Sequence, residues 1–307
     1  MADVRRAAII GTGTMGPGMG AVLARAGIDT ALYDISPEAL ERAKGGVELA
    51  SGVLERLDAV EGDGGGVRFE TELGAALEGA EFVIEAVPEK LELKQELFPQ
   101  LEAGAADGAI LASNTSGIPI TRIAAVCSRP ERVVGMHWSN PPHLIPMIEV
   151  IPGEQTSRET VDAASALVRR IGYHPVEERE VPGFVENRIL YAILRECLDL
   201  VDRGIIDPEG LDLNVRWGIG YKLAVIGPME LLDMAGLDIY NAVGSYLNQD
   251  LSTAGEVSST IRELIDKGRL GMKTGGGIYD YTPEQIDELR GRRAGKLVAV
   301  RKALEAE

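Results

Sequence analysis

The stretch Ala7-Ala-Ile-Ile-Gly-Thr-Gly-Thr-Met-Gly16 decides the fold of this 307-residue chain. Its first four residues are typical of a buried strand, and the G-x-G-x-x-G run that follows is typical of a turn that opens a helix. In that setting Gly11 permits a tight turn, Gly13 lets the backbone approach a pyrophosphate, and Gly16 lets the helix pack closely on the strand. The residues expected to hold the phosphates of a dinucleotide are Gly11, Thr12, Gly13, Thr14, Met15 and Gly16. A glycine-rich turn without a ligand is the alternative for the motif taken alone.

Asp34 supports the ligand-binding interpretation. It ends the second expected strand, about 20 positions beyond the middle glycine of the motif. A carboxylate at this position accepts hydrogen bonds from both ribose hydroxyls and repels a 2′-phosphate. The sequence therefore predicts that the chain binds NAD in preference to NADP.

The first half of the chain alternates short apolar runs with stretches of helical spacing. The expected strands are residues 7–10, 30–33, 67–69, 82–84, 109–112 and 133–136, and His174 is expected to begin a late edge strand. The expected helices are residues 15–26, 37–57, 91–103 and 118–126. Strands that alternate with helices indicate a doubly wound parallel sheet, so we predict a Rossmann-type α/β domain over residues 1–183.

The character of the sequence changes after Val181-Pro-Gly183. The expected helices beyond this point are residues 184–203, 208–217, 229–247, 257–267 and 283–304, with no strand between them. We therefore predict an all-α C-terminal domain over residues 184–307. Residues 229–247 carry more apolar faces than a solvated helix needs, which favours a homodimer formed through this domain.

Composition narrows the classes of partner. The formal net charge of −17 argues against nucleic acid and against an anionic membrane surface, because both would repel the chain. The uncharged residues 7–24 are interrupted by glycine too often for a membrane helix. Cys127 and Cys197 lack the spacing of a disulfide framework or a metal site. We therefore expect no metal and favour a reducing cytoplasm.

Three histidines, His137, His143 and His174, are the candidates for a catalytic proton carrier. His137 follows the buried run 133–136 at the carboxyl end of an expected strand, where open α/β sheets place their ligands. His143 lies in Pro141-Pro-His143 and His174 in the late edge strand, so we favour His137. A histidine with a purely structural role at a strand end is the alternative.

Separated blocks of sequence carry a resemblance to a known family. The blocks are Ser113-Asn-Thr-Ser116, His137-Trp-Ser-Asn-Pro141, Ile148-Glu-Val150, Val181-Pro-Gly-Phe-Val-Glu-Asn-Arg188 and Gly271-Met-Lys-Thr-Gly-Gly-Gly277. Together with the glycine motif they resemble, in order and spacing, the L-3-hydroxyacyl-CoA dehydrogenase family, to which gulonate and carnitine dehydrogenases are related. The resemblance spans essentially the whole chain and implies an NAD-dependent oxidoreductase that acts on a CH–OH group.

The resemblance assigns catalytic roles to individual residues. It implies that His137 is the general base for the substrate hydroxyl, and that Glu149 orients the imidazole and stabilises its charged form. It also implies that Ser116 and Asn187 hold the reacting oxygen. A turn serine and a helix-capping asparagine are the alternatives for these two residues.

The resemblance also extends the cofactor site. Glu89, Lys94 and Asn140 match family positions on the nicotinamide side of NAD, with Ser116 beside them, and Lys273 matches a lysine that reaches the cofactor from the C-terminal domain. For Glu89 and Lys94 a solvated helix start is the alternative.

The implied substrate is a short L-3-hydroxyacyl-CoA of the 3-hydroxybutyryl type, oxidised to the 3-oxoacyl-CoA, with a role in fatty acid metabolism. Family members that use coenzyme A esters typically carry lysines and a serine on the helix after the second strand. Here the acidic residues between positions 38 and 66 are Glu38, Glu41, Glu48, Glu55, Asp58, Glu61 and Asp63, and the basic ones are Arg42, Lys44 and Arg56. A surface of this charge does not attract a polyphosphate.

Other functions stay open from the sequence. A free polar hydroxy acid, of the kind that gulonate and carnitine dehydrogenases oxidise, suits the acidic segment, and Trp138 with Ser139 replaces the paired aromatic residues common in the family. A non-catalytic NAD-binding structural protein is an alternative of another class. A third is a dehydrogenase of different chemistry on the same scaffold, such as a 6-phosphogluconate-type or imine-reducing enzyme. The residues that argue against the non-catalytic protein are Ser116, His137, Glu149 and Asn187, and the pair of His137 and Glu149 argues against the different chemistry.

Overall fold

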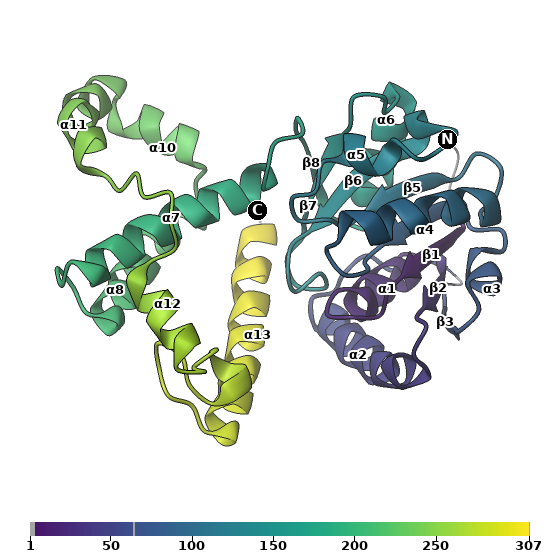
Figure 1. Cartoon of the computed structure of the whole chain (residues 1–307), viewed down its shortest axis with the longest axis horizontal. Helices are drawn as coiled ribbons and strands as arrows, with labels where there is room; N and C mark the ends of the chain where they lie inside the picture. The colour runs from purple at the N-terminus through teal and green to yellow at the C-terminus, as the bar shows by residue number, and fades with distance from the viewer. Residues whose placement is uncertain (1–3, 64, 307) are drawn as a thin grey trace. The chain divides into compact units, whose positions relative to one another are not determined.

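The computed structural model describes residues 4–63 and 65–306, which form two compact units (Figure 1). Unit 1 contains the described residues up to Asn187 together with Leu297–Lys302. Unit 2 contains Arg188–Lys296 and the described residues from Ala303 onward. The expected helical domain began at residue 184, whereas residues 184–187 and 297–302 lie in unit 1.

Unit 1 is built on one sheet of eight strands in the order β3-β2-β1-β4-β5-β6-β7-β8. The strands are β1 (Arg6–Ile10), β2 (Asp29–Tyr33), β3 (Val67–Glu70), β4 (Phe82–Glu85), β5 (Ile110–Ser113), β6 (Val133–Trp138), β7 (Met147–Pro152) and β8 (His174–Glu177). β6 and β7 are antiparallel, and the other neighbouring pairs are parallel. The Rossmann-type fold is therefore confirmed, with one antiparallel pair added to the expected parallel sheet.

The antiparallel step follows from the length of chain between β6 and β7. Residues 139–146 join the two strands, and a parallel neighbour would need a crossover of about a dozen residues or more. Sequence analysis missed β7, because a short apolar run carries no periodicity that separates it from other buried segments.

Helices cover both faces of the sheet (Figure 1). The helices of unit 1 are α1 (Gly16–Arg25), α2 (Pro37–Arg56), α3 (Leu73–Leu77), α4 (Leu91–Gly104), α5 (Ile120–Ala124) and α6 (Arg158–Arg170). One core contains residues of α1, α2 and α6, and the other contains residues of α3, α4 and α5. Along β1, Ala7 and Ile9 belong to the first core and Ala8 and Ile10 to the second. A strand buried on both faces explains the uninterrupted apolar run.

Two helices of unit 1 were not expected from the sequence, and one is shorter than expected. α3 is short. In α6 the buried residues Val161, Ala164 and Leu167 stand among charged residues in the sequence, which makes the apolar pattern difficult to recognise. α5 begins only after Pro119, because a residue that precedes proline is disfavoured in a helix.

Unit 2 is helical, as expected. Its helices are α7 (Phe184–Asp202), whose first four residues lie in unit 1, α8 (Pro208–Asn214), α9 (Tyr221–Leu223), α10 (Pro228–Ala235), α11 (Leu237–Asp250), α12 (Ser259–Asp266) and α13 (Pro283–Glu305), of which residues 297–302 also lie in unit 1. A π-helical turn, Val215–Gly220, joins α8 to α9. The single helix expected at 229–247 is divided, because Gly236 adopts a φ of +99°, which a right-handed helix cannot contain. Within the described residues, no helix has both the length and the apolar composition that crossing a membrane requires.

Close backbone packing explains two glycines between β1 and α1. Gly11 has a φ of +111°, and a Cβ atom at this position would lie 2.6 Å from the carbonyl oxygen of Ala86. A Cβ atom at Gly16 would lie 2.3 Å from the carbonyl oxygen of Gly11. Rotation of a side chain cannot relieve contacts with backbone atoms, so the entry to α1 requires glycine at both positions.

We expect Gly16→Ala to lower the free energy of unfolding by about 1–3 kcal/mol, because the added methyl group overpacks the loop. The control is Gly45→Ala in the interior of α2, where the added Cβ meets no heavy atom within 4 Å. Alanine is the better helix former, so the control should raise the free energy of unfolding by about 0.5–1 kcal/mol. Thermal denaturation of both variants measures the difference, and Tm shifts of the same sign would contradict the packing argument.

Candidate active site

The glycine loop leaves open space beside Gly13. A Cβ atom built on Gly13 meets no heavy atom within 4 Å, whereas the same atom at Gly11 or Gly16 meets the backbone. Among the described residues, no side chain caps the N-terminus of α1, so its first-turn N–H groups can bind an anion. The loop therefore fits the pyrophosphate of NAD, as its sequence predicts.

Asp34 follows β2 and is bonded to the glycine loop. Its Oδ2 accepts hydrogen bonds from the backbone N–H of Thr12 at 3.0 Å and from the Thr12 hydroxyl at 2.8 Å, and its Oδ1 accepts one from the N–H of Ser36 at 3.0 Å. Burial alone would raise the pKa of Asp34, but these hydrogen bonds outweigh burial and lower the pKa. Asp34 therefore carries a negative charge where the ribose of a dinucleotide binds in this fold.

The strand register places His137 opposite Glu149. The two residues are partners in the antiparallel pairing of β6 with β7, and Nδ1 of His137 lies 2.6 Å from Oε2 of Glu149. Both side chains are buried, with 9% and 2% of their surface exposed. His137 lies near the carboxyl end of β6, which is the same edge of the sheet as the glycine loop after β1. We refer to this pair as the His137–Glu149 dyad.

The first turn of α7 holds the Glu149 carboxylate. Its Oε1 accepts hydrogen bonds from the backbone N–H groups of Val185 at 3.0 Å and Glu186 at 2.7 Å. The ring of Phe184 packs beside the His137 imidazole, with ring centroids 5.7 Å apart. Burial opposes a charge on Glu149, but the hydrogen bonds with His137 and the Glu186 N–H outweigh it and lower the pKa of Glu149. The dyad therefore contains a fixed, charged carboxylate.

The other two histidines are placed less suitably. His143 packs against α1, where a Cβ atom on Gly18 would lie 2.9 Å from its Nδ1, and burial lowers the pKa of His143. His174 is exposed and begins β8 at the edge of the sheet, as expected. Neither has a carboxylate partner comparable to Glu149 among the contacts of the described residues.

Ser116 and Asn187 lie together. The side-chain amide of Asn187 donates a hydrogen bond to the carbonyl oxygen of Ser116 at 3.2 Å, and the N–H of Ser116 donates one to Oε1 of Glu89 at 2.9 Å. Asn187 is the fourth residue of α7, so it does not cap that helix. The fold thus brings together two residues that are 71 positions apart in the sequence.

Lys94 lies in a buried ion-pair network. Its ammonium group is 2.7 Å from Oε1 of Glu85 and 3.3 Å from Oε2 of Glu89, and its side chain is 1% exposed. Glu85 also accepts a hydrogen bond from the Ser113 hydroxyl at 2.6 Å, and Glu89 accepts one from the Thr115 hydroxyl at 2.5 Å. The alternative of a solvated helix start is therefore wrong for Lys94. The network joins the carboxyl ends of β4 and β5 and fixes the loop that contains Ser116.

The remaining predicted cofactor residues lie in separate places. Asn140 is exposed and follows β6, at the same edge of the sheet as His137. Lys273 is exposed in the 3-10 turn Met272–Thr274 of unit 2. Contact of either residue with the nicotinamide stays a prediction.

Sequence analysis missed two carboxyl groups beside the dyad, Glu178 and Glu186. The Ser139 hydroxyl donates a hydrogen bond to Oε2 of Glu186 at 2.5 Å, and Glu178 shares the N–H of Val185 with Glu149. The sequence signal that could have found them is the position of these two glutamates on either side of Pro182-Gly183, which lead from β8 into α7.

Trp138 and Ser139 have different surroundings. Trp138 is buried and packs edge-on against Tyr173, with ring centroids 5.9 Å apart, so it belongs to the core and does not reshape a pocket. Ser139 contacts Glu186 beside the dyad. Of the two residues that replace the family's paired aromatics, only Ser139 therefore contacts a residue beside the dyad.

The acidic surroundings of His137 serve hydrogen bonding. Atoms of His137, Glu149 and Glu186 that could ligate a metal lie within 4.8 Å of one another. Glu149 already bonds the imidazole and two backbone N–H groups, and Glu186 bonds a hydroxyl. We therefore assign these oxygens to the hydrogen-bond network of the dyad.

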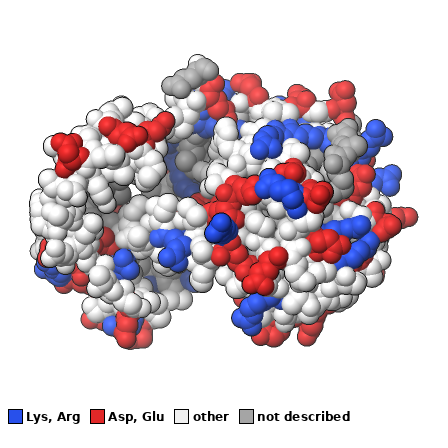
Figure 2. All heavy atoms as spheres, turned by 90° about the horizontal axis from the view of Figure 1, so that it is seen from above, with Lys and Arg blue, Asp and Glu red and all other residues white. Residues whose placement is uncertain are grey.

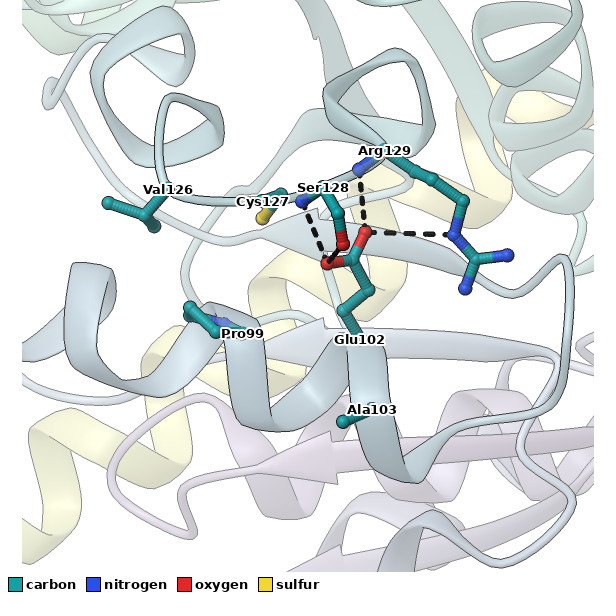
Figure 3. A pocket seen from close by; sticks show the side chains of 7 residues that line it. All are labelled: Pro99, Glu102, Ala103, Val126, Cys127, Ser128 and Arg129. Atoms are coloured by element: carbon teal, nitrogen blue, oxygen red, sulfur yellow. Dashed lines mark hydrogen bonds and ion pairs between the residues drawn. The ribbon is translucent and has the colours of Figure 1, made fainter.

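A hollow of about 410 Å³ lies at the amino ends of β5 and β6 (Figure 3). Glu102 at the end of α4 accepts hydrogen bonds there from Ser128 and from the N–H of Arg129, which ties two segments together. Burial, together with the charge of Glu102, raises the pKa of the Cys127 thiol to about 12, so the thiol is a poor nucleophile. Open α/β sheets bind ligands at the carboxyl ends of their strands. The hollow is therefore separate from the candidate active site.

Two domain models of one family match the chain. The NAD binding domain of 3-hydroxyacyl-CoA dehydrogenase matches residues 6–181, and the C-terminal domain of 3-hydroxyacyl-CoA dehydrogenase matches residues 183–281. The two matches leave unmatched residues 1–5, residue 182 and the stretch from residue 282 onward.

Relatives with two kinds of substrate in their names resemble the chain. The 5-formyl-3-hydroxy-2-methylpyridine 4-carboxylate 5-dehydrogenase of Mesorhizobium japonicum is 54% identical over 305 residues, covering 98% of this chain and 99% of its own. A crystal structure of an enzyme of this name, described as an NAD+ dependent dismutase, is 53% identical with a TM-score of 0.96 and covers 99% of both chains. A probable 3-hydroxybutyryl-CoA dehydrogenase of Deinococcus radiodurans is 37% identical over 278 residues, covering 89% of this chain and 99% of its own.

The cofactor and the family follow from these findings together with the geometry. The geometry of the glycine loop and Asp34 fits an NAD site, and both domain models belong to one family. The chain belongs to the 3-hydroxyacyl-CoA dehydrogenase family and is an NAD-dependent oxidoreductase of that type.

Proposed function

We propose that His137 is the general base of the dehydrogenase reaction, with Glu149 orienting it and with Ser116 and Asn187 holding the reacting oxygen. The observation that carries this proposal is the 2.6 Å contact between Nδ1 of His137 and Oε2 of Glu149. A charged carboxylate at this distance accepts a hydrogen bond from the protonated Nδ1 of the imidazole. Nε2 then carries no proton and can accept one from the substrate. The dyad and the glycine loop share the carboxyl edge of the sheet, which suits a reaction between substrate and cofactor.

Each group then has one task. Oxidation at a hydroxyl-bearing carbon needs one acceptor for a hydride and one for a proton, and NAD supplies the hydride acceptor when it is bound. His137 takes the hydroxyl proton at Nε2, and the buried Glu149 carboxylate stabilises the positive charge that His137 gains. Ser116 and Asn187 are neutral, which suits an oxygen that becomes a carbonyl.

A buried dyad argues against the alternative of a non-catalytic NAD-binding protein. Removing Glu149 from water costs free energy that a purely structural role does not require, and such groups cluster at functional sites. The same dyad disfavours a dehydrogenase of different chemistry on this scaffold.

We further propose that the substrate is a small aromatic carboxylate of the 5-formyl-3-hydroxy-2-methylpyridine-4-carboxylate type. The relative with this name shares 54% identity over nearly the whole chain. Membership of the family accounts for the hydride and proton chemistry, but a shared fold does not determine the substrate. A substrate of this type falls in the class without coenzyme A, which the sequence had left as the alternative.

The acidic segment over residues 38–66 supports a substrate without a polyphosphate arm. Lys44 on α2 already pairs with Glu41 at 2.6 Å, and Arg56 donates a hydrogen bond to the carbonyl oxygen of Gly52 at 3.2 Å. Cations that are already engaged, among more numerous carboxylates, offer little attraction to the phosphates of coenzyme A.

A formyl group suits the same catalytic set once it is hydrated. The hydrate carries a hydroxyl group and a hydrogen on one carbon, as a secondary alcohol does, so His137 removes the hydroxyl proton while a hydride leaves the carbon and a carboxylic acid forms. Reduction of a second formyl group to an alcohol uses His137 in reverse, as the proton donor. The two half-reactions convert two aldehydes and one water into one carboxylic acid and one alcohol, with no net consumption of NAD. The solved relative is itself described as a dismutase.

A short L-3-hydroxyacyl-CoA, with a role in fatty acid metabolism, is the second candidate. It is favoured by the family match and by the 37% identity to a probable 3-hydroxybutyryl-CoA dehydrogenase. The same residues would act on its 3-hydroxyl group.

We also propose that the protein is a cytoplasmic enzyme that acts on small molecules. Cys127 and Cys197 both carry free thiols, which favour a reducing compartment. The net charge of −17 disfavours nucleic acid and an anionic membrane surface as partners.

Turnover with NAD distinguishes the two substrate classes. We expect kcat/KM for 5-formyl-3-hydroxy-2-methylpyridine-4-carboxylate to exceed that for 3-hydroxybutyryl-CoA by at least about tenfold, or ~1.4 kcal/mol. The KM for acetoacetyl-CoA, reduced with NADH, should change little between low and high salt, because carboxylates outnumber cations over residues 38–66 and leave little attraction there for salt to screen. Preferred turnover of the coenzyme A ester, with a KM that climbs steeply with salt, would establish the second candidate instead.

His137→Gln should reduce kcat by about 10²-fold or more while leaving the Kd for NAD nearly unchanged, because the imidazole acts on the substrate proton. The matched control is His174→Gln, the same change at an exposed position of the sheet edge, which should retain wild-type kcat. Steady-state kinetics and NAD titration measure both quantities. A His137→Gln variant that keeps a tenth of wild-type kcat would exclude His137 as the base.

We propose that unit 2 forms a homodimer. Within the described part of Arg188–Lys296, none of the large hydrophobic side chains is buried, and Met234 on α10 and Tyr246 on α11 are 75% and 65% exposed. Figure 2 shows extended uncharged areas on this unit. A helical unit that buries so little of its own apolar surface needs a partner surface, and a second copy is the commonest one.

Sedimentation should give about twice the chain mass of 32.8 kDa. Met234→Glu should raise the dimer dissociation constant at least about tenfold, because it places a charge on the apolar face. The control is Leu49→Glu on α2, an exposed leucine of unit 1, which should leave the mass unchanged. A wild-type chain that sediments as a monomer at micromolar concentration would contradict the proposal.

A further inference from the structure

Glu178 is a second carboxyl group placed against the His137–Glu149 dyad. It follows β8, which runs beside β7 with Val176 as the register partner of Glu149. The backbone N–H of Val185 donates to Oε1 of Glu149 and to Oε1 of Glu178, at 3.0 Å in both cases. Two carboxyl groups therefore meet at one donor, at the start of α7.

One oxygen of Glu178 can be satisfied only by a proton of its own. Oε2 is buried and receives no hydrogen bond from any described residue. A buried carboxylate oxygen without a donor is unfavourable, whereas a protonated carboxyl group can itself donate to a neighbouring carboxylate. The hydrogen-bond partner available to it is the side chain of Glu149.

The proton belongs on Glu178 and the charge on Glu149. Glu149 bonds the His137 imidazole and the N–H groups of Val185 and Glu186, which stabilise a carboxylate. Glu178 has the Val185 N–H alone, and burial together with the neighbouring charge of Glu149 raises the pKa of Glu178 to about 7.

The charged surroundings agree with this assignment. The titratable groups that act on Glu178 from neighbouring elements are Glu149 on β7 and His137 on β6, whereas the Glu186 carboxyl group on α7 bonds the Ser139 hydroxyl. The flanking carboxylates of its own segment are engaged elsewhere, Glu177 with Arg158 at 2.6 Å and Glu180 with the N–H of Thr121 at 2.8 Å.

We propose that Glu178 is a positioning residue that shares its proton with Glu149 and thereby holds that carboxylate against His137. The inference rests on the proposed catalytic role of the dyad. Loss of the shared proton removes a hydrogen bond and brings two like charges into contact. An ionised Glu178 repels the Glu149 carboxylate at hydrogen-bond distance. Its attraction to His137 acts over a longer distance, because Glu149 lies between the two residues, so the repulsion is the larger effect. Ionisation of Glu178 therefore loosens the dyad.

The test is the pH dependence of Glu178→Gln, whose neutral amide donates a hydrogen bond and cannot ionise. Measured with 5-formyl-3-hydroxy-2-methylpyridine-4-carboxylate and NAD, its kcat should match wild type near pH 6 and exceed it by about threefold or more near pH 9, where wild-type Glu178 is ionised. The matched control is Glu177→Gln, the same change at the adjacent exposed carboxylate, whose ratio to wild type should stay constant with pH. A constant ratio for Glu178→Gln would overturn the inference.

A second measurement needs no substrate. The folded protein keeps the Glu178 proton up to about pH 7, whereas an unfolded chain loses it near the ordinary value of 4.5. The folded state therefore binds more protons between these values, and its stability contribution falls as pH rises. We expect the Tm of Glu178→Gln, relative to wild type, to increase between pH 5 and pH 8, with no such trend for Glu177→Gln. If the Tm values of Glu178→Gln and wild type changed in parallel with pH, the proposal that Glu178 keeps a shared proton in the folded state would be overturned.

The two measurements separate this inference from the proposed function. If His137→Gln keeps its activity while the Tm trend appears, the dyad is not catalytic but the shared proton stands. If His137→Gln is inactive and Glu178→Gln follows wild type at every pH, the dyad stands and the role of Glu178 is refuted. Should Glu178→Gln fail to fold, ¹³C-carboxyl NMR of the wild-type protein decides, because a glutamate that titrates near pH 7 is expected and its absence would refute the inference.

Discussion

The antiparallel pairing of β6 with β7 is the constraint on which the candidate active site depends. Side chains alternate between the faces of a sheet, so a slip of one residue in this register would turn Glu149 away from His137. The short connection over residues 139–146 permits only an antiparallel return, and the pairing then sets the two side chains opposite each other. The first turn of α7 adds two N–H donors to the same carboxylate. One strand pair and one helix start therefore position the proposed general base.

A second network, centred on the buried Lys94, lies beside the loop that carries Ser116. Lys94 joins Glu85 and Glu89, and these carboxylates hold the hydroxyl groups of Ser113 and Thr115. Lys94 and Glu85 are both buried, and removing one partner of a buried ion pair costs about 3–5 kcal/mol, so these two residues depend on each other. Glu89 in turn accepts hydrogen bonds from the Thr115 hydroxyl and the Ser116 N–H, which hold the loop that carries Ser116.

In the proposed reaction, the parts of the molecule that perform the chemistry are distinct from those that would select the substrate. Hydride and proton transfer need the glycine loop, Asp34 and the dyad, and these occupy one edge of the sheet. The acidic helix α2 and the Ser139–Glu186 contact lie outside that set. One relative is named for a pyridine carboxylate and another for a coenzyme A ester, so membership of the family does not by itself determine the substrate.

The sequence by itself determined the cofactor domain and the helical character of the second half, because these signals are local, and it singled out His137 as the candidate base. The glycine motif, the position of Asp34 and the alternation of apolar runs each lie within a short window of chain. Resemblance between separated blocks then named Glu149, Ser116 and Asn187. It could not show that Lys94 is buried, that Trp138 belongs to the core, or that Gly236 divides a helix.

Tertiary structure decided which of these residues meet. Glu178 and Glu149 lie on neighbouring strands, and their contact arises from strand order and register, which no periodicity in either segment records. The ionisation of a carboxyl group depends on the charges and donors within a few ångströms, and such neighbours come from distant parts of the chain. For that reason candidate site residues could be named from the sequence, whereas their protonation and their partners required the fold.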